Sequence, residues 1–185
     1  MDSGALGRYR FFKHLGFFGI EPQTRRGART FLGTTDTLLA SSGNAVWLTP
    51  QARFMDVRER PLRLQAGVGA LAARHPGTVF LPLAIEYAFW TEPRPEILVA
   101  FGQPFLPGDE PERSAAEWTD TFTDALESVQ DELAIGSCRR DVHEWIMLDR
   151  GKSGVSGIYD GWRWLQARIH GEKFERQHCP EVSWR

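Results

Sequence analysis

Apolar residues are distributed along the chain in two kinds of pattern, short continuous runs and runs with helical spacing. Short runs that end at Pro, Gly or polar residues predict strands over 16–20, 45–48, 78–87 and 96–102. Apolar positions three and four residues apart predict helices over 5–14, 25–42, 64–75, 114–135 and 157–170. Alternating strands and helices are typical of layered α/β proteins. We therefore expect an α/β fold with a mixed, mostly parallel sheet flanked by helices.

The segment 114–135 is the clearest of these elements. Its apolar stripe consists of Trp118, Phe122, Leu126, Val129 and Leu133. The side predicted to face solvent carries Glu117, Asp120, Asp124, Glu127 and Asp131. This separation predicts a helix that packs on the core through one face.

The length of 185 residues and the hydrophobic content of 42% fit one globular domain over 1–185. Within it we expect an irregular segment over 136–156 and an unanchored tail over 171–185. Two cysteines are too few for a disulfide framework, so a reducing compartment is the default. No run of apolar residues is long enough to predict a membrane-spanning helix.

Charge is unevenly distributed along the chain. Residues 1–75 carry 11 Lys and Arg against 5 Asp and Glu, whereas residues 76–185 carry 11 against 19. The basic first part favours an anionic ligand or surface, although opposite faces of one domain could simply differ in charge. Nucleic-acid binding is poorly supported, because the net charge is −2 and no binding motif is recognised.

Arginines follow two of the predicted strands. The apolar run at 46–48 ends at Thr49-Pro50, and the following residues include Arg53, Arg58, Arg60 and Arg63; Arg25 and Arg26 follow the run at 16–20. A third strand ends at Glu86 and Tyr87. Ligands of α/β proteins bind at the carboxyl ends of strands, and arginine suits phosphate. These arginines predict a shared anion site, the alternative being solvated loop residues.

Four segments of the chain resemble motifs of one enzyme family. They are "LGFFGIEPQTRRGARTFL", "LTPQARFMDVRERPLRLQAGVGALA", "VFLPLAIEY" and "GVSGIYDGWRWLQARIHGEKF". In order and spacing they resemble the bacterial phospholipid/glycerol acyltransferases, which include the 1-acyl-glycerol-3-phosphate acyltransferases. The second segment resembles the family motif Phe-Pro-Glu-Gly-Thr-Arg-Ser.

The resemblance implies transfer of a fatty acyl group from acyl-CoA or acyl carrier protein to the hydroxyl of a lysophospholipid-like acceptor, with no further cofactor. In the family a histidine takes the proton of the hydroxyl, which then attacks the thioester. An aspartate five residues later orients the imidazole. The resemblance assigns Arg26 and Arg53, with Arg25 secondary, to the acceptor phosphate, Gln51 to its polar head and Pro50 to the shape of the loop.

The chain departs from the family in two places. None of the residues five positions after His14, His75, His143 and His178 is acidic, and His170, followed by Glu175, comes after the other motifs. We therefore expect a chain shortened before its first motif, with an apolar sheet edge or face left uncovered. Gln51 and Ala52 stand where the family has Glu and Gly.

Two functional hypotheses arise from the resemblance and these departures. The first is an acyltransferase-family protein, inactive as this chain if the catalytic histidine is required. The alternative is a non-catalytic lipid- or acyl-binding remnant. A lipid acceptor implies a cytoplasmic protein peripheral to the inner face of the membrane, and the predicted helix 157–170, with Trp162 and Trp164, could contact that surface or pack on the core.

Overall fold

The computed structural model describes residues 2–9, 11–90, 94–149, 164, 168 and 169. They fall into two compact units. The first unit comprises the chain up to Leu83 and Phe101–Val129. The second comprises Ala84–Ala100 and the chain from Gln130 onward. The single domain predicted over 1–185 stays a prediction. The tail 171–185 and most of the helix predicted over 157–170 lie outside the described residues.

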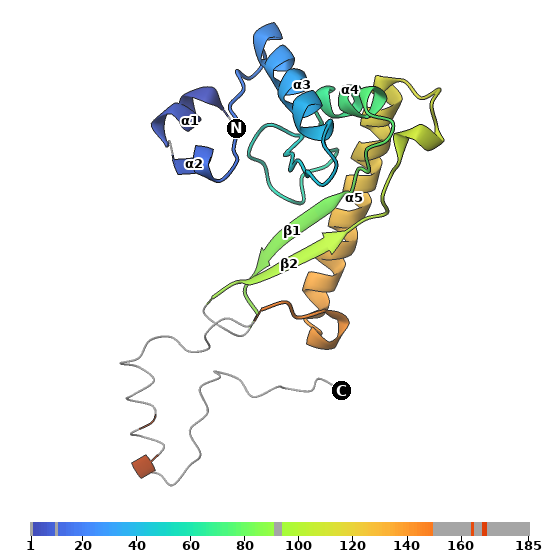
Figure 1. Ribbon diagram of the computed structural model, residues 1–185. Coiled ribbons are helices and arrows are strands. Elements are labelled where there is room, and N and C mark those ends of the chain that lie inside the picture. Colours follow the sequence, from blue (N-terminus) through green and yellow to red (C-terminus); the bar gives the residue numbers. More distant parts are fainter. Residues whose placement is uncertain (1, 10, 91–93, 150–163, 165–167, 170–185) are drawn as a thin grey trace. The chain divides into compact units, whose positions relative to one another are not determined.

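The four predicted helices that lie in described residues form, most of them with shifted ends (Figure 1). The segment 5–14 is split into α1 (Ser3–Arg8) and α2 (Phe11–His14). The next two are α3 (Arg25–Leu39) and α4 (Gly67–Arg74). Helix α5 (Ala115–Arg139) continues four residues beyond its predicted end, so the first part of the segment 136–156 is helical rather than irregular. Two short 3₁₀ turns complete the described helices, η1 (Pro107–Asp109) and η2 (Val142–Glu144).

The described sheet is a pair of antiparallel strands, β1 (Leu83–Ala88) and β2 (Glu96–Phe101) (Figure 1). A bridge between Phe80 and Phe105 extends the pairing. The predicted strand over 45–48 is not a strand and its Trp47 is exposed; among the described residues this run has no pairing partner and no buried face. In the run 16–20, Ile20 forms a single bridge to Asp2. The mostly parallel sheet stays a prediction.

The core of the first unit is aromatic. Trp118 and Phe122 of α5 are buried and stack with ring centroids 5.5 Å apart. Phe80 stacks on Phe122 at 5.1 Å, and Phe105 meets the same ring edge-on at 5.6 Å. The predicted stripe of α5 is thus confirmed at Trp118, Phe122, Val129 and Leu133, all of which are buried.

Helix α4 packs on α5 through small residues. Ala72 is fully buried against Trp118 and Phe122. A side chain at Gly69 would overlap the carbonyl oxygen of Ala115 and the hydroxyl of Thr119. Because the two backbones approach so closely there, only glycine fits at position 69 without moving a helix.

One face of the strand pair in the second unit is apolar and open. Ala84, Glu86 and Leu98 are buried, whereas Tyr87 and Ile97 are more than half exposed and Ile85 and Val99 are partly exposed. Successive side chains of a strand alternate between faces, so these four share the outer face. An apolar face of this strand pair is thus left uncovered within the described residues, whereas the uncovered edge expected from a shortened chain stays a prediction.

Two glycine substitutions test the close packing of α4 on α5. We expect Gly69→Ala to destabilise the protein by about 1–3 kcal/mol, because the added methyl group overlaps α5 backbone. Gly33→Ala is the matched control, since it lies in α3 with open space around it; it should stabilise by about 0.5–1 kcal/mol. Urea unfolding of both variants measures this, and equal effects would contradict the proposed contact.

Candidate functional site

The start of α3 places two arginines in its first turn. The Thr24 hydroxyl accepts a hydrogen bond from the Gly27 amide at 2.9 Å and donates to the Glu21 carbonyl at 3.1 Å. Any side chain at Gly27 would overlap that carbonyl, so glycine is needed to close the turn. Arg25 and Arg26 follow Thr24 directly, and the first turn holds no acidic residue. Positive charges at the positive end of the helix dipole are unfavourable, so an anion would be favoured there.

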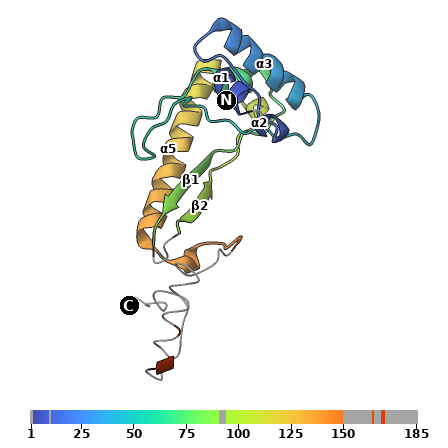
Figure 2. The same ribbon diagram turned by 90° about the vertical axis from the view of Figure 1, so that its left-hand side faces the viewer.

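The segment 50–65, which we call the basic loop, is closed at its base. The Gln65 amide donates a hydrogen bond to the Pro50 carbonyl at 2.8 Å. The Ala52 amide donates to the Thr49 carbonyl at 3.1 Å, and Ala52 has a φ of 55°. This is the left-handed conformation that glycine adopts most easily. Figure 2 shows the loop in teal, projecting from the helices of the first unit.

A second attachment holds the basic loop on α5. The amide of Leu62 donates a hydrogen bond to the Glu127 carboxylate at 2.5 Å, and the Leu62 side chain is buried. The prediction that Glu127 lies on a purely solvated side of the helix is therefore wrong. Its carboxylate accepts a backbone amide from a segment 65 residues away in sequence. Helical spacing could not show this, because the partner comes from a distant loop.

Polar side chains within the basic loop bond mainly to the loop itself. The Arg53 guanidinium forms an ion pair with Glu59 at 3.1 Å, and both side chains are 49% exposed. The Gln51 amide lies 2.9 Å from the Met55 sulfur. Arg60 donates to the carbonyl oxygens of Val57 and Glu59, both at 3.0 Å. These contacts fix the loop and leave the half-exposed guanidinium of Arg53 with donors for a ligand.

The predicted phosphate-binding residues fall into two groups. Pro50, Gln51 and Arg53 belong to the basic loop, and Arg25 and Arg26 belong to the start of α3. Arg26 contacts Glu21 at 3.8 Å. Within the part of the chain that the structure describes, no hydrogen bond or ion pair joins the two groups, so the single shared anion site stays a prediction.

Glu86 occupies a different place from the one predicted. It lies inside β1 rather than at a strand end, and its side chain is buried. The Ser137 hydroxyl of α5 donates to its carboxylate at 3.3 Å. Glu86 therefore belongs to the packing of the second unit and is not a group offered to a ligand at a strand end.

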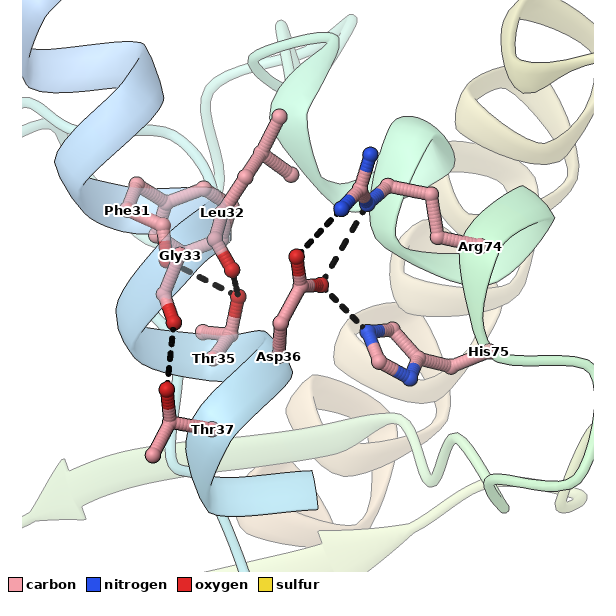
Figure 3. A network of polar contacts seen from close by, with 8 residues as sticks. All are labelled: Phe31, Leu32, Gly33, Thr35, Asp36, Thr37, Arg74 and His75. Atoms are coloured by element: carbon pink, nitrogen blue, oxygen red, sulfur yellow. Dashed lines mark hydrogen bonds and ion pairs between the residues drawn. The ribbon is translucent and has the colours of Figure 1, made fainter. Parts of the chain in front are cut away.

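Sequence reasoning missed a polar cluster that joins α3 to the end of α4 (Figure 3). The Asp36 carboxylate accepts hydrogen bonds from the Arg74 guanidinium and lies 2.7 Å from Nε2 of His75. The pKa of Asp36 is held below its usual value of 3.8; the largest cause is the hydrogen bond from Arg74 and the second is the hydrogen bond with His75. The two halves lie 38 and 39 residues apart in sequence, so no local signal could have paired them.

This cluster contains a histidine–carboxylate pair, the chemical unit found in the catalytic motif of the family that the sequence resembles. The Asp36 carboxylate that contacts His75 also forms an ion pair with Arg74, so two side chains hold it. The backbone amide of His75 also closes α4, through the carbonyl oxygens of Leu71 and Ala72. We therefore interpret the cluster as a link between two helices rather than as a catalytic pair.

The lowered pKa of Asp36 predicts a pH-dependent contribution to stability. A carboxylate with a depressed folded-state pKa stabilises the fold above its unfolded-state pKa and loses this contribution as the pH falls through the folded value. Asp36→Asn should therefore lower the unfolding temperature at neutral pH, with the difference from the natural protein shrinking below about pH 4. The control is Asp120→Asn, at an exposed position on α5; an equal loss in both variants would contradict the role given to the Asp36 contacts.

Comparisons with protein-family models, with curated proteins and with solved structures found no match to this chain. In the described ranges, no helix is both long and apolar enough to cross a bilayer. Nor do His, Cys, Asp and Glu side chains of these ranges gather into a group that could hold a metal ion. Within the described ranges, the basic loop and the arginines at the start of α3 stay the anion-binding groups that the sequence predicts.

Proposed function

We propose that this chain is an acyltransferase-type protein whose basic loop binds the phosphate end of a lysophospholipid-like acceptor. The observation that carries the proposal is Arg53, held by Glu59 in a loop closed between Pro50 and Gln65. The ion pair orients the guanidinium without enclosing it. A planar guanidinium with free donors can hold two phosphate oxygens at once, which a lysine cannot do.

The backbone at Ala52 also supports the proposal. The resembling family has glycine at this position, directly after the residue that corresponds to Gln51. Ala52 adopts a left-handed φ of 55°, for which glycine is the favoured residue. The third residue of Pro-Gln-Ala thus has the conformation that a glycine there would adopt most easily.

In the proposed reaction the acceptor hydroxyl attacks the thioester carbonyl of acyl-CoA or acyl carrier protein. The new ester bond forms as the carbon–sulfur bond breaks, and the thiol leaves with the proton of the hydroxyl. The donor is soluble and the acceptor is a lipid, so a cytoplasmic protein peripheral to the inner face of the membrane fits this chemistry. No nucleic acid is involved.

One observation favours the second candidate, a lipid- or acyl-binding protein without turnover. The chain has no His-(four residues)-Asp motif, and the His75–Asp36 pair is part of a link between α3 and α4. A transfer assay with acyl-CoA or acyl carrier protein thioester and a lysophospholipid separates the two. Turnover above that of heat-inactivated protein favours the enzyme, whereas acceptor binding without turnover favours the binding protein.

Replacement of Arg53 tests the acceptor site. We expect Arg53→Ala to weaken binding of a soluble short-chain lysophosphatidic acid by about tenfold or more, because a charge-assisted hydrogen bond is lost. Arg94→Ala removes a described, exposed arginine of the second unit and should leave the affinity unchanged. Calorimetric titration measures both, and equal affinities for Arg53→Ala and the natural protein would refute the assignment.

A glycine substitution tests the conformation of the loop. Ala52→Gly should stabilise the protein by up to about 1 kcal/mol, because it relieves the left-handed alanine but makes the unfolded chain more flexible. The matched control, Ala28→Gly at an exposed position in α3, should destabilise by about 0.5–1 kcal/mol. Urea unfolding gives both values; a comparable loss at Ala52 would mean that its φ is not left-handed.

A further inference from the structure

The basic loop carries a large apolar side chain at its most exposed point. Phe54 is fully exposed, and Val57 is 41% exposed. Single exposed apolar residues are common on soluble proteins and need no explanation by themselves. Here, however, two of them lie within four residues of each other in a segment that is held in shape by its own hydrogen bonds.

The attachments of the loop explain why Phe54 stays exposed. The base is closed by the bond between Gln65 and Pro50, and Leu62 is fixed to α5 through Glu127. Arg60 bonds to two carbonyl oxygens of the loop. Since the backbone is held at several points, the loop cannot easily fold back to bury the Phe54 ring.

The charge of the loop specifies the chemistry of a partner. Residues 50–65 contain four arginines and two acidic residues, Asp56 and Glu59. Asp56 accepts a hydrogen bond from the Arg58 amide at 2.8 Å, and Glu59 pairs with Arg53. The loop is therefore net positive and bears an exposed aromatic ring. Aromatic rings beside basic residues are what amphipathic segments use to enter the boundary between lipid headgroups and acyl chains.

We propose that the basic loop docks on an anionic lipid surface, with Phe54 inserted below the headgroups and the exposed Arg53 and Arg63 directed at the lipid phosphates. Val57 adds apolar area at the same surface. Anionic lipids attract basic segments, whereas neutral lipids do not, so binding depends on lipid charge and falls with added salt. This inference is linked to the proposed function in one respect: docking on a membrane would bring the loop to a lipid acceptor.

Vesicle sedimentation with the full chain tests the docking. The probes are vesicles of phosphatidylcholine alone and of phosphatidylcholine mixed with phosphatidylglycerol. We expect the natural protein to bind the anionic vesicles and to be released by salt. Phe54→Ser should weaken this binding by about ten- to hundredfold, because the variant has no phenyl ring to transfer from water into the membrane. The matched control is Phe89→Ser, which removes another exposed phenylalanine outside the loop and should bind like the natural protein.

A second measurement separates this inference from the acceptor site. Titration with glycerol 3-phosphate, which has no acyl chain, should give Phe54→Ser and the natural protein the same affinity. Loss of vesicle binding with that affinity retained supports the docking surface. The docking surface would be overturned if Phe54→Ser bound the anionic vesicles as well as the natural protein does. It would also be overturned if Phe89→Ser lost as much binding as Phe54→Ser, or if the natural protein bound neutral vesicles as strongly as anionic ones. Failure of the natural protein to bind glycerol 3-phosphate, with vesicle binding intact, would count against the proposed acceptor site alone.

Discussion

The packing of α4 against the aromatic face of α5 is the constraint on which the first unit depends. Trp118 and Phe122 are large and buried, and Ala72 of α4 packs against them. Gly69, which has no side chain, lets the backbones of α4 and α5 nearly touch. The basic loop ends where α4 begins, and its Leu62 is bound to α5. The same packing that forms the core therefore fixes the loop.

The basic loop divides its polar groups between internal support and exposure. Arg60 and Gln51 bond within the loop, whereas Arg53 is tied at one point and half exposed. At the start of α3, two arginines stand where the helix dipole disfavours them. Local sequence choices that oppose local stability are most often found at functional sites. Both features would suit the two proposed roles, binding of an acceptor phosphate and binding of lipid phosphates at a membrane surface.

The proposed binding and the proposed transfer place different demands on the chain. Binding needs oriented arginines, and the loop supplies Arg53 in a fixed ion pair. Transfer needs a base beside the acceptor hydroxyl. The His75–Asp36 pair shares its carboxylate with Arg74 and joins the ends of two helices. A histidine beside an aspartate is thus no sufficient sign of catalysis, because the same atoms can serve to hold helices together.

The sequence alone determined the helices of this protein well and its contacts poorly. Apolar spacing located α3, α4 and α5 and identified the buried stripe with Trp118 and Phe122, because the helical period depends only on local order. The run 45–48 was predicted as a strand from composition, but strand formation needs a partner strand, and none pairs with it in the described chain.

Residue chemistry in the sequence drew attention to Arg53 and Gln51, yet only the tertiary structure showed the loop that holds them. Pro50 and Gln65 meet, Glu127 accepts the Leu62 amide, and Asp36 contacts both Arg74 and His75, all across distances in sequence that no local pattern spans. Hydrogen bonds between distant segments depend on the packing that brings those segments together, which local sequence order does not specify. The sequence by itself therefore determined which residues could bind an anion, and the packing decided which of them are fixed and exposed.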